Sequence, residues 1–443
     1  MNKTVGLVSL GCAKNQIDAQ LLLGALREAG YAVSPDPAEC GVVIINTCGF
    51  IESAKQEAIE TILEFAQLKQ AGTVGALLIT GCLAQRYGDE LAAELPEVDG
   101  ALGIGCNGEI VSAVAAIMAG ERYFAFGKRE DLSFEGKRAL SGPAYTAYLK
   151  IAEGCDNLCS FCAIPGIRGR FRSRPKENII AEARRLVESG ALELNLVAQD
   201  TTRYGEDIYG KLTLPELLGE LCEIEGLRWL RLLYCYPDRI TDQLLETIAS
   251  QPKIVKYIDL PVQHACGKVL REMNRRGDAT SLLALVEKIR KKIPGVALRT
   301  TMIAGFPGES EGEFEQLCDF VKATRFDRLG CFAYSQEEGT PAGERADQLD
   351  EETKRRRADI IMETQSYIAA DIAQSMQGKT LEVLCEGHDK DRQEYFGRSP
   401  ADAPDIDTKV YFTASAPPAI GSFVRVQVTG ADGYDLIANY RSH

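Results

Sequence analysis

The chain has 443 residues, of which 45% are hydrophobic and 26% are charged, and this composition is ordinary for soluble globular proteins. At about 150 residues per domain, the length predicts roughly three domains. The formal net charge of −14 argues against non-specific nucleic-acid binding, and no apolar run reaches the length of about 18 residues that a membrane-spanning helix needs. We therefore expect a cytoplasmic protein with no membrane partner, whose clustered cysteines stay reduced and point to metal binding or catalysis.

The first part of the chain repeats one pattern three times. Each repeat is a short apolar run followed by a helical pattern, and the runs are residues 5–12, 40–48 and 74–82. Continuous apolar runs of this length are typical of strands buried on both faces of a parallel sheet. The pattern predicts an open parallel α/β sheet with a further strand near 100–104, followed by a charged, glycine-containing linker at 127–143.

The middle of the chain contains six strand candidates separated by helical segments. They are residues 148–152, 193–198, 229–235, 255–260, 297–303 and 329–333. Thr213 with Glu216, and Ser310 with Glu313, have the spacing of helix-starting capping boxes. Six βα units in succession predict a parallel, partly closed barrel with its site at the carboxyl ends of the strands. A charged helical stretch at 349–376 leaves this domain.

The tail from Gln377 to His443 consists of short β-rich runs separated by Gly, Pro and Asp, and the runs are residues 380–385, 409–413, 423–429 and 434–438. This pattern predicts a small five-stranded barrel of the OB kind, which is a common nucleic-acid module. From Met376 onward, however, the tail has seven Lys and Arg against ten Asp and Glu, a net charge of −3. We therefore do not expect this barrel to bind RNA.

Cys155, Cys159 and Cys162 form a CxxxCxxC loop directly after the first strand of the middle domain. Three thiolates from one short loop suit a cubane iron–sulfur cluster. Such clusters normally take four cysteines, so one iron remains without a protein ligand and is open to bind a substrate. The alternative is a three-cysteine zinc site or cysteines without a metal, and the lack of a nearby fourth Cys or His disfavours it.

This loop resembles that of the radical S-adenosylmethionine superfamily, in which the open iron binds that cofactor. The resemblance implies that the methionine amino and carboxylate groups chelate the iron, and that one electron then splits the sulfonium to give a 5′-deoxyadenosyl radical. It gives Cys155, Cys159 and Cys162 a catalytic as well as a metal-binding role. It also implies cofactor contacts beside the loop and at the strand ends, at Phe161, Gln199, Gln263, Gly305 and Gly308.

Cys12, Cys48 and Cys82 each end one of the apolar runs of the first part. In an open α/β sheet these positions converge at one edge, near the crevice where such sheets bind ligands. Three thiolates there predict a second metal cluster, again with one open iron. The alternative is three buried structural cysteines, because free cysteine is often buried.

Four arginines follow the cysteine loop, namely Arg168, Arg170, Arg172 and Arg174. If the stretch is extended, alternate side chains point the same way, and their guanidinium groups are suited to hold a carboxylate bidentately. The alternative is a solvated basic rim.

The two cysteine sets together resemble those of the methylthiotransferase family, and the resemblance covers essentially the whole chain. Members of this family replace a C–H bond by C–S–CH₃. Segments 9–18, 46–62 and 162–175 resemble its RimO-type branch, which modifies the β-carbon of an aspartate in the twelfth small-subunit ribosomal protein. The tRNA-modifying branch tends instead to show a GCQMN-like first motif, where this chain has GCAKN.

The resemblance implies a domain division and a set of partners. The domains are an N-terminal cluster domain at 1–126, the linker at 127–143, a radical S-adenosylmethionine domain at 144–375 and a TRAM-like barrel at 376–443. The implied cofactors are two [4Fe-4S] clusters and S-adenosylmethionine. The implied partners are a basic ribosomal protein as substrate and a flavodoxin- or ferredoxin-like electron donor. Two alternatives stay open: a tRNA adenosine substrate, and a non-catalytic iron–sulfur or RNA-binding adaptor.

Overall fold

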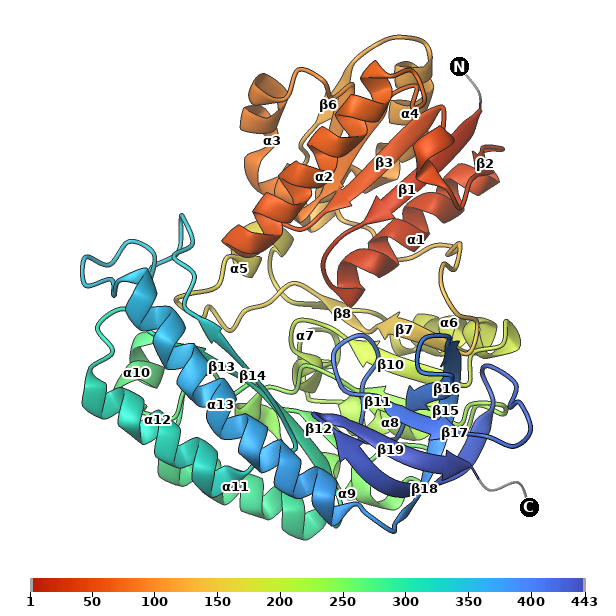
Figure 1. The fold of residues 1–443 in the computed structure, drawn as a ribbon. Coiled ribbons are helices and arrows are strands. Elements are labelled where there is room, and N and C mark those ends of the chain that lie inside the picture. The colour runs from red at the N-terminus through yellow and green to blue at the C-terminus, as the bar shows by residue number, and fades with distance from the viewer. Residues whose placement is uncertain (1–2, 441–443) are drawn as a thin grey trace. The chain divides into compact units, whose positions relative to one another are not determined.

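The computed structural model describes residues 3–440, and the chain divides into two compact units (Figure 1). The first unit comprises the chain up to Gly142 together with Ala152–Arg172 and Ser335–Glu344. The second comprises Pro143–Ile151, Ser173–Tyr334 and the chain from Arg345 onward. Between residues 3 and 440, no helix is both long enough and apolar enough to cross a membrane.

The first unit contains a six-stranded parallel sheet in the order β2-β1-β3-β4-β5-β6. Its strands are β1 (Thr4–Ser9), β2 (Ala32–Val33), β3 (Val42–Thr47), β4 (Leu77–Gly81), β5 (Gly100–Gly103) and β6 (Tyr123–Ala125). The predicted open parallel sheet is confirmed, including its fourth strand. Strands β2 and β6 were not predicted, because two or three residues are too few to show a periodic pattern.

Helices cover both faces of this sheet. They are α1 (Ala13–Glu28), α2 (Glu52–Gln70), α3 (Cys82–Glu94) and α4 (Ile110–Met118). Consecutive residues of β3 point to opposite faces: Ile44 packs with Leu26 of α1, whereas Ile45 packs with Ile62 of α2. Burial on both faces explains why these strands read as continuous apolar runs. The unit also contains β8 (Ala152–Glu153) and the short helix α5 (Ile164–Arg168).

In the second unit, six parallel strands follow one another in chain order. They are β7 (Thr146–Lys150), β10 (Glu193–Val197), β11 (Trp229–Leu232), β12 (Tyr257–Asp259), β13 (Ala297–Ala304) and β14 (Arg328–Ala333). They form two three-stranded sheets, and a parallel bridge between Leu230 and Ile254 links β11 to the segment that enters β12. The predicted six-unit partial barrel is confirmed.

Helices separate these strands, as predicted. They are α6 (Lys176–Glu188), α7 (Glu206–Tyr209), α8 (Leu214–Cys222), α9 (Asp242–Ser250), α10 (Gly267–Glu272), α11 (Ala279–Lys292), α12 (Glu311–Thr324) and α13 (Glu351–Ser375). The capping box of Ser310 with Glu313 starts α12. Thr213 is the N-cap residue of α8, so the predicted helix start is confirmed there too, but its side chain makes no capping hydrogen bond.

The tail forms a closed five-stranded barrel in the order β15-β16-β17-β19-β18, as predicted. Its strands are β15 (Thr380–Asp389), β16 (Glu394–Arg398), β17 (Val410–Thr413), β18 (Phe423–Asp432) and β19 (Asp435–Tyr440). Val383, Phe412 and Val426 are fully buried in its core. Strand β16 escaped prediction because EYFGR is short and lacks strict alternation.

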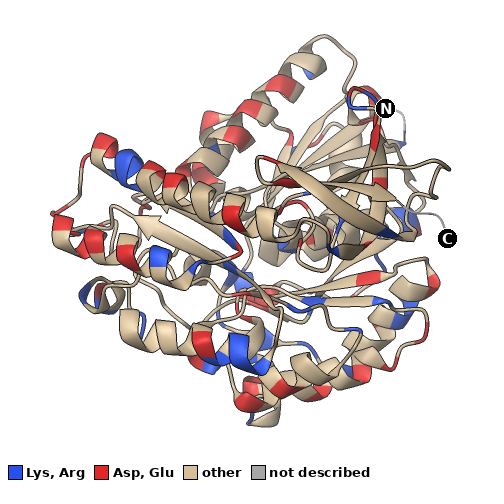
Figure 2. Cartoon of the chain, turned by 60° about the horizontal axis from the view of Figure 1, so that its bottom comes forward, with Lys and Arg blue, Asp and Glu red and all other residues tan. Residues whose placement is uncertain are grey.

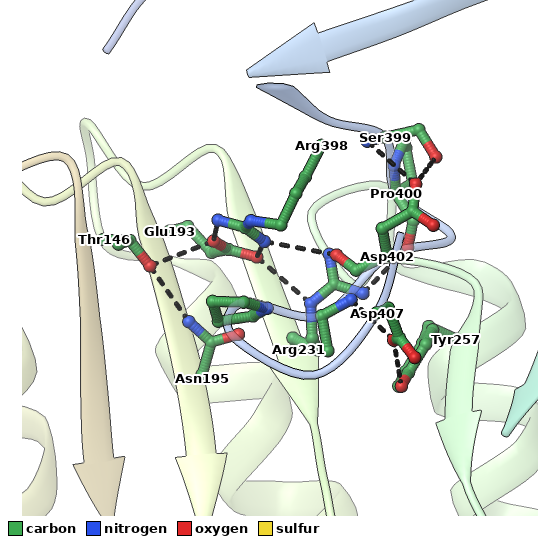
Figure 3. Close-up of polar contacts among 12 residues, drawn as sticks. Thr146, Glu193, Asn195, Arg231, Tyr257, Arg398, Ser399, Pro400, Asp402 and Asp407 are labelled. Atoms are coloured by element: carbon green, nitrogen blue, oxygen red, sulfur yellow. Dashed lines mark hydrogen bonds and ion pairs between the residues drawn. The ribbon is translucent and has the colours of Figure 1, made fainter. Parts of the chain in front are cut away.

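The loop between β16 and β17 inserts among the first residues of the parallel strands, within the second unit (Figure 3). Asp407 accepts a hydrogen bond of 2.7 Å from Tyr257, the first residue of β12, and Asp402 pairs with Arg328, the first residue of β14, at 2.6 Å. The backbone carbonyl of Pro400 accepts a bond of 2.9 Å from Arg231. This loop therefore fills the amino end of the partial barrel, opposite the carboxyl ends where such barrels place their sites.

Candidate functional site

Cys12, Cys48 and Cys82 lie just beyond three adjacent strands, β1, β3 and β4. The register pairs Ser9 of β1 with Asn46 of β3, and Thr47 of β3 with Gly81 of β4. The three cysteines therefore follow the carboxyl ends of neighbouring strands at similar heights, which is the arrangement expected from their positions in the sequence.

A glycine beside each cysteine allows these three turns to touch. A Cβ atom at Gly11 would lie 2.7 Å from the Cβ of Cys48, and one at Gly49 would lie 2.7 Å from the Cα of Leu83. Gly81 has a φ of +99° and leaves room for the carbonyl oxygen of Thr47. Since none of these approaches tolerates a side chain, the glycines are needed for the cysteines to come together.

The three thiols differ in exposure and in their tendency to ionise. Cys12 is exposed, Cys48 is half-buried and Cys82 is 5% exposed. The protein atoms around Cys12 disfavour its thiolate, but Lys14 and Arg168 outweigh them and lower its pKa. Burial raises the pKa of Cys82 to about 11; Arg168 opposes this effect, whereas Cys12 and Cys48 add to it. Three thiolates here repel one another, so the donor set fits a cationic iron cluster, which removes that repulsion.

Arg168, in α5, is the largest buried polar group at this site and is 1% exposed. Its Nη1 donates to Asp18 Oδ2 at 2.6 Å and to Glu153 Oε2 at 3.0 Å. Its Nη2 donates to Asn15 Oδ1 at 3.2 Å and to Cys82 Sγ at 3.3 Å. One guanidinium group therefore contacts a candidate cluster ligand and two carboxylates at once.

The loop of Cys155, Cys159 and Cys162 lies in the same unit, and all three cysteines are half-buried. At its start, Gly154 has a φ of +77°, and a Cβ there would overlap the carbonyl oxygen of Arg170. The Cys155 N–H donates to the Gly169 carbonyl at 3.1 Å, and the Cys162 N–H donates to the Cys159 carbonyl at 3.0 Å. The loop is thus closed by hydrogen bonds of its own backbone.

Across residues 3–440, no three His, Cys, Asp or Glu side chains are gathered as ligands of a single metal ion. A cubane cluster has a different requirement, because each thiolate binds a different iron and the sulfurs lie farther apart than around one ion. Both sets supply three thiols from rigid turns, and this donor chemistry fits such a cluster.

The residues expected to contact the cofactor fall in both units. Phe161 is half-buried in the cysteine loop of the first unit. Gln199 follows β10, and Gln263, which has a φ of +72°, follows β12 and bridges Met302 of β13. Gly305 and Gly308 follow β13 at φ values of +76° and +73°. In this structure, Lys354 occupies the space beside Gly305, and the side chain of Asp347 occupies the space beside Gly308.

The four arginines after the loop do not share one orientation. Arg168 and Arg174 are each 1% exposed, whereas the side chain of Arg170 is 85% exposed. Arg174 pairs with Glu182 at 2.7 Å and donates to the carbonyl of Lys150. The stretch is not uniformly extended, since it begins in helix α5, so the period of two does not apply.

Glu337 is a buried residue of the first unit that sequence reasoning missed. It pairs with Arg86 of α3 at 2.8 Å and with Lys55 of α2 at 3.5 Å, and it accepts a bond of 3.0 Å from the N–H of Glu52. Helix α2 follows Cys48 and helix α3 begins at Cys82, so this carboxylate connects the two helices next to these candidate ligands. No local pattern signals a contact between residues about 250 positions apart.

Comparison with known families agrees with this architecture. Residues 4–103 match the Uncharacterized protein family UPF0004, residues 149–321 match the Radical SAM superfamily and residues 378–440 match the TRAM domain. The fold, the cysteine loop and these matches define the class: the chain is a radical S-adenosylmethionine enzyme that carries a TRAM barrel. Membership of this superfamily implies a [4Fe-4S] cluster and S-adenosylmethionine as cofactors.

Curated relatives give the particular family. The chain is 49% identical over 439 residues to the ribosomal protein uS12 methylthiotransferase RimO of Desulforamulus reducens, covering 98% of each chain. It is 48% identical to the RimO protein of Desulfitobacterium hafniense and 47% identical to that of Geobacter sulfurreducens, covering at least 97% of each chain. The chain belongs to the RimO family of radical S-adenosylmethionine methylthiotransferases. It is therefore an enzyme, and the adaptor alternative is wrong.

Among solved structures, the chain is similar to the radical S-adenosylmethionine methyltransferase TsrM from Kitasatospora setae. The TM-score is 0.58 at 15% identity, with 77% of this chain and 75% of that chain covered. At this identity the similarity concerns the fold alone.

Proposed function

We propose that this chain inserts a methylthio group at the β-carbon of an aspartate in ribosomal protein uS12, using two [4Fe-4S] clusters and S-adenosylmethionine. The observation that carries the proposal is the presence of two three-cysteine sets in one compact unit, with Arg168 linking the segments beside both. The family name of the curated relatives supports the choice of substrate.

In this proposal, Cys155, Cys159 and Cys162 hold the catalytic cluster, and Cys12, Cys48 and Cys82 hold the second one. When bound, the catalytic cluster and S-adenosylmethionine supply the one-electron chemistry that removes a hydrogen atom from the substrate. The protein orients these groups through rigid turns at Gly11, Gly81 and Gly154. In the same proposal, the residues that contact the cofactor are Phe161, Gln199, Gln263, Gly305 and Gly308. The domain boundaries fall after residues 126, 143 and 375.

The acidic net charge supports a basic protein substrate rather than tRNA. Part of the acidic charge of the barrel, however, is already paired within the protein. Acidic and basic residues are interspersed along the helices and strands, so the net charge of −14 is not gathered in one segment (Figure 2). Several barrel acids are already paired: Glu382 lies 3.0 Å from Arg228, and Glu386 lies 2.8 Å from Arg398. Asp432 also pairs, with Arg392 at 3.0 Å, but its side chain is 64% exposed, so Asp432 and the exposed Asp391 remain accessible to a lysine-rich partner.

The proposed electron donor is a flavodoxin- or ferredoxin-like protein, and the proposed location is the cytoplasm, where thiols stay reduced. The partial exposure of Cys155, Cys159 and Cys162 supports cluster loading and reduction from outside.

The test is to incubate the anaerobically reconstituted enzyme with S-adenosylmethionine, a reductant, and either uS12 or tRNA, and to measure the mass of both products. We expect uS12 to gain the mass of one methylthio group in place of hydrogen, at a single aspartate. A gain on tRNA with uS12 unchanged would contradict the proposed substrate and favour the tRNA alternative.

A further inference from the structure

Arg168 connects segments that lie beside both cysteine sets. Asn15 and Asp18 belong to α1, which begins directly after Cys12, and Cys82 itself begins α3. Glu153 ends β8, two residues before Cys155. Arg168 ends α5, six residues after Cys162. All these residues belong to the first unit.

Packing reinforces this connection. The apolar part of Cys82 packs with Ala163 and Ile167, which lie one and five residues after Cys162. Helix α5 thus contacts the candidate ligand Cys82 through its apolar face and through the terminal guanidinium of Arg168.

The chemistry of the side chain suits this role. A guanidinium group offers five N–H donors in a fixed plane and stays charged at any pH, so it can hold several acceptors in one geometry. A lysine in the same place has one compact charge and cannot reproduce that fork. Asp18 and Glu153 orient Nη1, and this leaves Nη2 aimed at the sulfur of Cys82.

We propose that Arg168 is a positioning residue for the N-terminal cluster: through its hydrogen bond to Cys82 Sγ it fixes that ligand and raises the reduction potential of the cluster the ligand holds. Hydrogen bonds to ligating sulfur stabilise the more negative, reduced state of a cluster, and second-shell donors of this kind tune metal sites. The inference rests on the proposed function, because it requires a cluster on Cys12, Cys48 and Cys82.

The experiment uses the full chain with Cys155, Cys159 and Cys162 replaced by Ala, so that the measured potential and iron belong to the N-terminal cluster alone. Arg168→Lys is introduced into this background, and the midpoint potential is measured by spectroscopic titration together with the iron content. Because Arg168→Lys leaves Asp18 and Glu153 poorly paired in the interior, Arg168→Met is also made in an Asp18→Asn, Glu153→Gln background. Its potential is compared with that background, so that the loss of the two carboxylate charges does not enter the comparison.

Arg174→Lys is the matched control, because Arg174 is an equally buried arginine that pairs with the carboxylate of Glu182 and donates to the carbonyl of Lys150. We expect both Arg168 variants to keep their iron and to show a more negative potential, while the Arg174 variant matches the background. The inference would be overturned, and the proposed function left intact, if the iron-loaded Arg168 variants had unchanged potentials or if the Arg174 variant showed an equal shift. A background protein without iron would contradict the proposed function itself, and the inference with it.

Discussion

Glu193 Oε2 lies 2.6 Å from Nη2 of Arg398, and this contact joins the first residue of β10 to the last residue of β16 (Figure 3). Glu193 also accepts from Arg231 at 3.1 Å and from Thr146 at 3.0 Å, and it is fully buried. The TRAM barrel and the parallel strands of the second unit therefore share one buried ionic network.

Replacing Glu193 by Gln should destabilise the protein by about 3–5 kcal/mol, because it leaves Arg231 and much of the charge of Arg398 uncompensated in the interior. Urea-induced unfolding followed by circular dichroism measures the change. Glu382→Gln is the matched control, since Glu382 pairs with Arg228 between the same two parts of the chain but both side chains are partly exposed, and its effect should stay below about 1 kcal/mol. Equal stabilities of the Glu193 variant and the wild type would refute the network's importance.

Glu193 also makes the stability of the fold depend on pH. Burial alone would raise the pKa of Glu193, but Arg398 and Arg231 outweigh it and lower the pKa from 4.5 to about 2. A carboxyl group with a lowered pKa stabilises the fold above its unfolded value, and this stabilisation is lost as the pH falls toward the folded value. The stability difference between the wild type and Glu193→Gln should therefore be constant near neutral pH and shrink below about pH 4.5. A difference that stays constant on acidification would contradict this assignment.

The sequence was most informative where local patterns govern structure. The six parallel strands of the partial barrel and the strands that precede Cys12, Cys48 and Cys82 were predictable, because burial on both faces leaves a continuous apolar run. Short elements such as β2, β6 and β16 were missed, because they contain too few residues to show a period.

Contacts between distant segments were not predictable. Arg168 was considered either a carboxylate-binding group or part of a solvated rim, and only the folded structure brings it to Cys82 and Asp18. Likewise, nothing beside Glu337 indicates that it reaches Arg86. Buried ion pairs of this kind depend on tertiary packing, which one sequence without homologues does not reveal.

The two cysteine sets should divide the chemistry. A Cys12→Ala, Cys48→Ala, Cys82→Ala variant should still cleave S-adenosylmethionine reductively, because radical generation needs only the Cys155–Cys162 loop, but it should form no methylthio product. Chromatography of 5′-deoxyadenosine and mass spectrometry of uS12 measure the two activities. Cys40→Ala, which removes a buried cysteine of the same sheet domain outside the set, should retain both. Methylthio product from the triple variant would disprove this division.

The accessible acids of the barrel should steer the substrate. Asp391→Lys with Asp432→Lys should slow uS12 modification, most strongly at low salt, because screening weakens long-range attraction. Cofactor cleavage without substrate should be unchanged, since neither residue lies near a cysteine set in the sequence. Glu287→Lys with Glu315→Lys reverses two exposed charges on α11 and α12 and serves as the control. If both pairs slow the reaction equally, or neither does, the barrel acids have no specific role.

The iron content of the anaerobically reconstituted chain tests most directly whether both cysteine sets hold clusters. At four irons per cubane, the wild type should bind about eight irons per chain, and replacing either cysteine set by Ala should leave about four. Inductively coupled plasma mass spectrometry gives the iron per chain, and Mössbauer spectroscopy verifies that the iron is in cubane clusters. A wild type that never exceeds about four irons, or a variant that keeps its full iron after losing one set, would contradict the two-cluster account.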